Sequence, residues 1–162
     1  MNIEYFITTI EDIPEIIRMR IAYMIDDFGS ITNEDRCAIE TQLSEYLPRE
    51  LNRSTVVFAA RDLDSDTPNR IIATALLHII EMPASSLVIN GRCGEVLNVL
   101  TEPKYRGQGI CSRLIDDLIA YGKAHDLARI DLSATAAGYP IYEKHGFVRK
   151  DNYYTDMRLK LK

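Results

Sequence analysis

The chain has 162 residues, of which 46% are hydrophobic and 27% are charged, and its formal net charge at pH 7 is −5. This length predicts a single domain over residues 1–162 that buries about two thirds of the surface its unfolded chain exposes. The acidic balance argues against general nucleic-acid binding, which normally needs a basic stripe, and it fits a cationic acceptor such as an amine without requiring one.

Hydropathy and cysteine spacing exclude further classes of protein. No apolar run reaches the roughly 18 residues that a membrane span needs, and the first residues carry acids rather than a basic, apolar leader. Cys37, Cys93 and Cys111 are irregularly spaced, which indicates reduced thiols rather than a disulfide framework. Neither they nor the three histidines show metal-ligand spacing, so His78 and the others are interpreted as solvated or hydrogen-bonded side chains. We therefore expect a cytoplasmic protein with no metal, no membrane and no nucleic acid as partner.

The first third of the chain predicts one strand and two helices. Residues 3–7 are a plausible strand, and Asp12 can cap a helix with Pro14 in its first turn and isoleucines along one face. Thr32 begins a capping box for a second helix, which is expected to end before Pro48.

A series of strands is expected next. Residues 54–61 are rich in β-forming side chains, residues 62–69 form a polar hairpin turn, and residues 71–80 are an apolar strand long enough to be buried or to bend midway. The mixed connection from 81 to 94 carries a short strand at 86–89.

Residues 95–119 are the most informative segment. An apolar, β-branched run leads into a glycine turn, and the turn opens into an amphipathic helix, which is a physical recipe for holding phosphate groups at the helix N-terminus. The turn is not a dinucleotide fingerprint, because Ser112 stands where a third glycine is needed, and no Lys-Ser/Thr pair follows as in a Walker loop. Taken alone, the turn is equally compatible with an ordinary strand-to-helix connection.

The remaining elements complete an α+β pattern. Residues 128–133 predict a strand, residues 136–144 a short helix that ends at Gly146, and residues 147–148 and 153–161 a final hairpin. The strand–helix–strand unit that starts at residue 95 needs a parallel crossover, so the sheet is expected to be mixed.

Three spaced elements resemble the GNAT superfamily of N-acyltransferases. The turn at 106–111 (RGQGIC) is similar to the coenzyme A motif [Q/R]-x-x-G-x-[G/A], and residues 102–105 supply its usual acidic-Pro-x-Tyr lead. Residues 142–147 (YEKHGF) are similar to the family's Y-E-K-x-G-F, and residues 9–14 (TIEDIP) to its opening T-x-x-D-I-P. The resemblance implies the GNAT fold, a twisted, mixed, mostly antiparallel sheet with one parallel strand–helix–strand crossover, flanked by helices.

The resemblance also implies acetyl-CoA as co-substrate, with no metal. It assigns coenzyme A binding to the motif strand, to the glycine turn and to one residue before the short helix. These residues are Leu97, Asn98, Val99, Thr101, Arg106, Gly107, Gln108, Gly109, Ile110, Cys111 and Thr135. The backbone N–H near Val99 is implied as the donor to the thioester oxygen, where the motif strand and its parallel neighbour diverge.

Some positions depart from the family pattern. Cys111 stands where Gly or Ala is usual, and we interpret it as a packing substitution rather than a nucleophile, because no base sits in a partnering motif. Thr135 replaces a frequent Asn and Gly138 an Ala, which puts the contact from position 135 to the pantetheine in doubt. Asn98 is polar within an apolar run, and such a side chain commonly bonds a neighbouring backbone group instead.

Two residues are predicted to carry the chemistry. Glu95, eleven residues before Arg106, stands where some family members place a general base; the alternatives are a solvated or ion-paired strand-end acid, with water relaying the proton. Tyr142 matches the tyrosine that the family frequently uses as general acid; the alternative is a tyrosine packed against Phe147.

The resemblance implies acceptor recognition by the first two helices and the loop between them, where Asp26 and Asp27 are adjacent and would receive a cationic amine, unless they are simply a solvated helix end. The resulting hypothesis is an N-acetyltransferase that transfers acetyl from acetyl-CoA to a primary amine of a small molecule or peptide, by direct attack in a ternary complex. Dimers are common in the family, which allows a homodimer. The alternatives are an acyl-CoA sensor or scaffold without turnover, and a nucleotide-binding regulator that uses the same turn for ATP.

Overall fold

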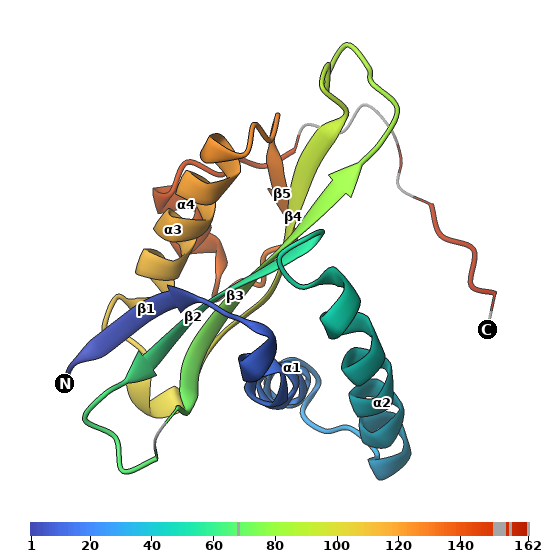
Figure 1. The fold of residues 1–162 in the computed structure, drawn as a ribbon. Helices are drawn as coiled ribbons and strands as arrows, with labels where there is room; N and C mark the ends of the chain where they lie inside the picture. The colour runs from blue at the N-terminus through green and yellow to red at the C-terminus, as the bar shows by residue number, and fades with distance from the viewer. Residues whose placement is uncertain (68, 151–154, 156, 162) are drawn as a thin grey trace.

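The computed structural model describes residues 1–67, 69–150, 155 and 157–161, and it shows a twisted sheet with helices on both faces (Figure 1). The elements in chain order are β1 (Ile3–Ile7), η1 (Ile10–Asp12), α1 (Ile13–Phe28), α2 (Asn33–Glu50), β2 (Thr55–Asp62), β3 (Ile71–Glu81), β4 (Arg92–Thr101), η2 (Pro103–Tyr105), α3 (Ile110–Ala124), β5 (Ile130–Leu132) and α4 (Tyr139–Lys144). The strand order is β1-β2-β3-β4-β5, and every neighbouring pair is antiparallel except β4 and β5, which confirms the predicted α+β fold. No helix within the described residues has the length and apolar character needed to cross a membrane.

Each face of the sheet has its own apolar core. On β2, Val56 and Phe58 belong to the cluster under α3, whereas Val57 and Ala59 pack toward α1 and α2. Because both faces are covered, β2 and β3 read as nearly continuous apolar runs instead of alternating ones. A polar side chain on either face of these strands therefore needs a local explanation.

The start of α2 follows the predicted capping chemistry, whereas the start of α1 and the end of α2 differ from the prediction. Thr32 Oγ1 accepts a hydrogen bond of 3.0 Å from the Asp35 N–H, as expected for the start of α2. The Asp12 carboxylate instead accepts from the Thr9 N–H at 2.8 Å, so it caps the short η1 turn that precedes α1. Pro48 lies inside α2 rather than beyond it, because Leu47 is buried and its carbonyl accepts from the Leu51 N–H at 2.9 Å, which continues the last turn.

The connection between β3 and β4 corrects one predicted strand. Residues 86–89 do not form a strand, since Ser85 and Val88 exchange two backbone hydrogen bonds of 3.1 Å and close the segment on itself. Leu87 and Ile89, on either side of the buried Val88, are exposed. The strand pairing resumes at Arg92, three residues earlier than residue 95 where the apolar pattern begins.

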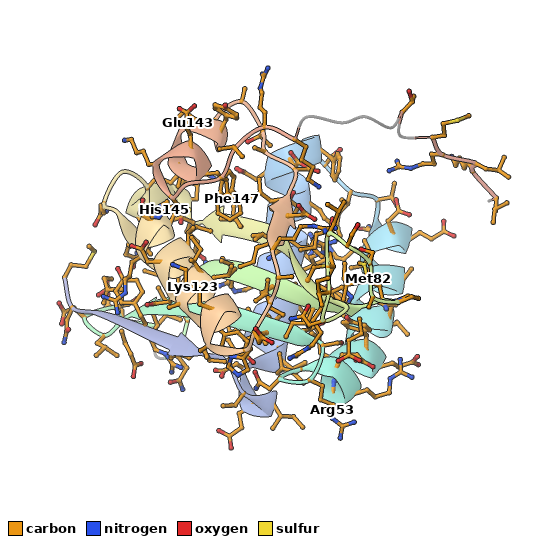
Figure 2. All side chains as sticks on the ribbon, turned by 90° about the horizontal axis from the view of Figure 1, so that it is seen from above. Arg53, Met82, Lys123, Glu143, His145 and Phe147 are labelled. Carbon is orange, nitrogen blue, oxygen red and sulfur yellow. The ribbon has the colours of Figure 1, made fainter. Side chains whose placement is uncertain are left out.

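The first arm of the predicted final hairpin is not a strand. Phe147 and Val148 lie outside any strand, and Phe147 packs edge-on against Tyr142 with ring centroids 5.9 Å apart. Within the second arm, residues 153, 154 and 156 lie outside the described residues, and 155 and 157–161 have no regular secondary structure. Seen from above, Phe147 lies on the same side of the molecule as α4 and α3 (Figure 2).

An ion-pair network fixes α1 over the end of the sheet. Arg18 pairs with Glu15 at 2.8 Å and with Glu102 at 3.0 Å, and Arg70 also pairs with Glu102 at 2.8 Å. Glu15 in turn accepts from the Ile71 N–H at 2.8 Å. These partly buried, shared pairs are worth more than isolated surface pairs, and they hold the N-terminal half of α1 against the start of β3 and the end of β4.

Candidate active site

A cleft of about 700 Å³ opens where β4 and β5 stop pairing. The parallel ladder runs only from the Gly94–Ile130 pair to the Val96–Leu132 pair. Beyond it, the cleft is lined on one side by residues 96–101 of β4 and on the other by Ser133, Thr135 and α4. Unpaired edge groups of β4 can therefore bond to a ligand that lies between the two strands.

The glycine turn forms one end of this cleft. Gly107 has φ +74° and Gly109 has φ +80°, a conformation that favours glycine, although a Cβ at either position would meet no atom within 4 Å. Within the described chain, no backbone N–H from Gly107 to Ser112 donates to a protein acceptor, and α3 begins at Ile110. The turn thus presents a run of N–H groups at a helix N-terminus, which is the arrangement that binds a phosphate.

Hydrogen bonds to other parts of the protein hold the two polar side chains of the turn in place. Arg106 donates from Nε to the Thr101 carbonyl at 2.9 Å and from Nη2 to Asp26 at 2.8 Å, while Gln108 donates to the Lys104 carbonyl at 3.2 Å. The Arg106–Asp26 pair is about half exposed, so an incoming phosphate can compete with the Asp26 carboxylate for the guanidinium.

We expect Gly109→Ala to weaken acetyl-CoA binding by about 10-fold and to lower the free energy of unfolding by about 1 kcal/mol, because an alanine at this φ is strained and the turn must shift. Calorimetric titration and urea denaturation would measure the two effects. Gly29→Ala is the matched control, since Gly29 has φ +83° and an equally open Cβ position at the end of α1. An equal loss of affinity in both variants would show that the weaker binding does not come from the conformation of the turn.

A bulge in β4 lies at the centre of the cleft. The register runs from Leu76–Leu97 to Thr74–Leu100, so Asn98 and Val99 together oppose a single residue of β3. Asn98 takes φ +50°, and its buried amide donates to Thr74 Oγ1 at 3.2 Å. The Asn98 side chain therefore holds the bulge through side-chain partners, Thr74 and Arg20, rather than through the backbone group that the alternative interpretation expected.

Tyr142 lines the cleft from α4. Burial, followed by Cys111 and Tyr23, raises the pKa of its phenol to about 12, so the hydroxyl keeps its proton throughout the neutral range. Within the described residues the hydroxyl has no hydrogen-bond acceptor, although the ring packs against Phe147. The ring is packed as the alternative interpretation expected, but its hydroxyl is not hydrogen-bonded elsewhere in the described part of the chain, and its role as general acid stays a prediction.

Cys111 is the second residue of α3, and burial raises the pKa of its thiol. A neutral, partly buried thiol is a poor nucleophile, which supports the interpretation of Cys111 as a packing residue. Thr135 also lines the cleft, and its hydroxyl accepts from the Gly138 N–H at 3.1 Å, so what it can still offer a ligand is its proton.

Glu95 lies on β4 inside the same cleft and is partly buried. In the described part of the chain, no side chain hydrogen-bonds to or pairs with its carboxylate, which leaves it able to accept a proton. Its register neighbour on β3 is His78. Because directly opposed residues of an antiparallel pair point to the same face, both side chains lie on the face that α1 and α2 cover.

The acceptor residues predicted from the sequence are placed less favourably. Asp26 lines the cleft, but its carboxylate already pairs with Arg106. Asp27 does not line the cleft. A role for the pair in holding the amine stays a prediction.

Sequence reasoning missed Arg20 and His78. Arg20 of α1 lines the cleft, and its Nη1 donates to Asn98 Oδ1 at 3.4 Å. His78 was interpreted as a solvated or hydrogen-bonded histidine, and its Nδ1 does lie 3.3 Å from Thr55 Oγ1, but it also lines a second cavity beside the cleft. A signal for His78 was present in its position within an otherwise apolar strand, whereas nothing in the sequence separates Arg20 from the other polar residues of an amphipathic helix.

Comparison with known proteins agrees with this geometry. The chain matches the model of the acetyltransferase (GNAT) family over residues 13–147. It is similar to the crystal structure of a predicted acetyltransferase from Clostridium acetobutylicum solved with acetyl-CoA, at 30% identity and a TM-score of 0.82, over 97% of this chain and 96% of that one. It is also similar in fold to a GCN5-related N-acetyltransferase from Ralstonia eutropha JMP134, at 21% identity and a TM-score of 0.76, over 96% and 99% of the two chains. A third structure of this fold is glucosamine-6-phosphate N-acetyltransferase from Arabidopsis thaliana, at 17% identity and a TM-score of 0.65, over 97% and 99%.

Proposed function

We propose that this chain, which belongs to the acetyltransferase (GNAT) family, transfers an acetyl group from acetyl-CoA to a primary amine by direct attack within a ternary complex. One observation carries the proposal: three groups that have no partner among the residues described by the structure line a single cleft. These are the N–H groups of the glycine turn, the carboxylate of Glu95 and the protonated hydroxyl of Tyr142. A phosphate site, a base and an acid in one cavity are what transfer from a phosphorylated thioester to an amine requires.

The lining of the cleft supports binding of the pyrophosphate and the pantetheine of coenzyme A. The N–H groups from Gly107 to Ser112 would hold the pyrophosphate, assisted by the Arg106 side chain. The edge of β4 between Leu97 and Thr101 would bond the amide groups of the pantetheine, since its main chain is not paired with β5 there. The thioester would then lie near the Asn98–Val99 bulge, which is the middle of the cleft.

The chain's own groups would handle the charge and the protons. Glu95 would take a proton from the ammonium form of the acceptor, directly or through water, so that the free amine can attack. The backbone N–H near Val99 would stabilise the negative charge that develops on the thioester oxygen. The carbon–nitrogen bond forms as the carbon–sulfur bond breaks, and Tyr142 would donate a proton to the leaving sulfur. The balance is one amide, one CoA thiol and one released proton per ammonium consumed.

The proposal is tested by measuring CoA release with a thiol reagent across a panel of primary amines, with acetyl-CoA hydrolysis as the blank. Turnover with at least one amine supports it. Binding of acetyl-CoA with no turnover on any amine would instead favour the acyl-CoA sensor, and tight binding of ATP without binding of CoA would favour the nucleotide-binding regulator.

We expect Glu95→Gln to lower kcat/KM by about 100-fold near neutral pH, because the amide cannot accept the proton. Steady-state kinetics with acetyl-CoA and an amine that is turned over would measure this loss. Glu81→Gln, at the exposed end of β3, is the control. An unchanged kcat/KM in Glu95→Gln would remove Glu95 as the base.

A further inference from the structure

A second cavity, of about 290 Å³, adjoins the cleft between α1, α2 and strands β2 to β4. Arg20, Leu97 and Asn98 line both cavities, so the two meet at the β4 bulge. An acceptor that enters through the second cavity would bring its amine to the place where the thioester is proposed to lie. The volume suits one amino-acid side chain rather than a folded partner.

Arg20 is unusual among the arginines of the chain. It is partly buried, yet no carboxylate of the described residues lies within 4.0 Å of its guanidinium; its contacts are Asn98 Oδ1 at 3.4 Å and the Tyr23 ring at 5.6 Å. The other partly buried arginines all pair with a carboxylate. These are Arg18, Arg36, Arg61, Arg70 and Arg92.

Burial of Arg20 without an anion is unfavourable, and an anionic ligand would offset this desolvation. A guanidinium stays protonated and offers five N–H donors in a planar fork, and burying it without an anion leaves most of that capacity unused. Burial lowers the pKa of Arg20, which reflects the same desolvation, with Tyr23 acting in the opposite direction. A carboxylate that binds the fork in a bidentate manner would satisfy the group.

The second cavity has the chemistry of a side-chain pocket. Its walls are apolar at Leu43 and Leu76, and its floor carries a hydrogen-bonded chain from the Tyr46 hydroxyl to Thr55 at 2.7 Å and on to His78 at 3.3 Å. A side chain with an apolar body and a polar tip would match both parts.

We propose that the acceptor is an α-amino acid, whose carboxylate is bound by Arg20 and whose side chain occupies the second cavity. The amine, one carbon away from the carboxylate, then lies at the junction of the two cavities, on the side of β4 that carries Glu95. This inference rests on the proposed N-acetyltransferase function and deepens it, because it names the acceptor class. The carboxylate could also belong to the acyl group of a dicarboxylic acyl-CoA, which the experiment separates.

The test compares amino acids with the amines formed by removing their carboxylate: L-tyrosine with tyramine, L-phenylalanine with phenethylamine, and L-histidine with histamine. We expect acetyl-CoA to be used with an amino acid at a kcat/KM about 100-fold above that of its matched amine. Arg20→Gln should lower kcat/KM for the amino acid by about 100-fold and that for the matched amine much less, so that the preference is lost, and Arg20→Lys should keep part of the preference. Arg49→Gln is the control, because Arg49 is an exposed arginine at the end of α2 that lines neither cavity.

Several outcomes would overturn the proposal: equal use of amino acid and amine by the unmodified enzyme, an equal loss of both in Arg20→Gln, or a preference for succinyl-CoA over acetyl-CoA that depends on Arg20. Calorimetric titration of the CoA-loaded protein with L-tyrosine and tyramine gives a readout besides turnover. The two proposals can fail separately. If no acceptor is acetylated, but the protein binds tyrosine and not tyramine and Arg20→Gln loses this binding, the carboxylate site is supported and the proposed function is not. Absence of binding across the three amino acids would reject the site itself.

Discussion

Tyr142→Phe is expected to lower kcat by about 100-fold with little change in acetyl-CoA affinity, because the variant keeps the ring and loses only the proton donated to the leaving sulfur. The packing against Phe147 is retained, so the fold should not change. Burial raises the pKa of Tyr142 to about 12, and burial does so by disfavouring the phenolate. The hydroxyl therefore stays protonated as the pH rises toward 10, and kcat should show no basic limb from Tyr142 in that range.

Tyr139→Phe is the matched control for this measurement. Tyr139 lies on the same short helix, and its hydroxyl donates to Glu143 at 3.3 Å, outside the cleft. Steady-state kinetics and a calorimetric titration with acetyl-CoA on both variants separate the roles. Equal kcat values in the two variants would mean that the sulfur leaves as a thiolate or is protonated by water, and Tyr142 would then be a packing residue.

The strand–turn–helix unit was predictable because its signals are local. The positive φ angles of Gly107 and Gly109, the start of α3 and the direction of its first N–H groups all follow from a few adjacent residues. The same holds for the cap at Thr32. Where a local sequence rule and a tertiary contact favoured different structures, the structure followed the tertiary contact. Pro48 did not end α2, since burial of Leu47 stabilises the last turn.

The acceptor side could not be predicted, because it depends on how distant segments are brought together. His78 meets Thr55 and Glu95 only through the registers of β2, β3 and β4. Arg20 acquires significance only when α1 is placed over the β4 bulge and no carboxylate of the described residues is found beside it. The adjacent acids Asp26 and Asp27 attracted attention as a sequence feature, and the fold instead uses Asp26 to hold Arg106.

Substitutions of Asn98 test whether this residue contributes to activity through the backbone geometry of the bulge or through its side-chain amide. Asn98→Val is expected to lower kcat/KM by about 100-fold, because a β-branched residue resists φ +50° and a shift of the bulge by about 1 Å would misplace the neighbouring N–H groups. It should also lower the free energy of unfolding by about 2 kcal/mol, through backbone strain and the loss of the hydrogen bond to Thr74.

Asn98→Gly removes the same side chain but accepts the left-handed conformation, so it should keep the bulge and most of the activity while losing the amide contacts to Thr74 and Arg20. Urea denaturation and steady-state kinetics on the two variants give the comparison. Activity retained by the glycine and lost by the valine would assign the role of Asn98 to backbone geometry. An equal loss of activity in two folded variants would assign it to the amide itself, and the donor to the thioester oxygen would then have to be sought among side chains, with the Asn98 amide first.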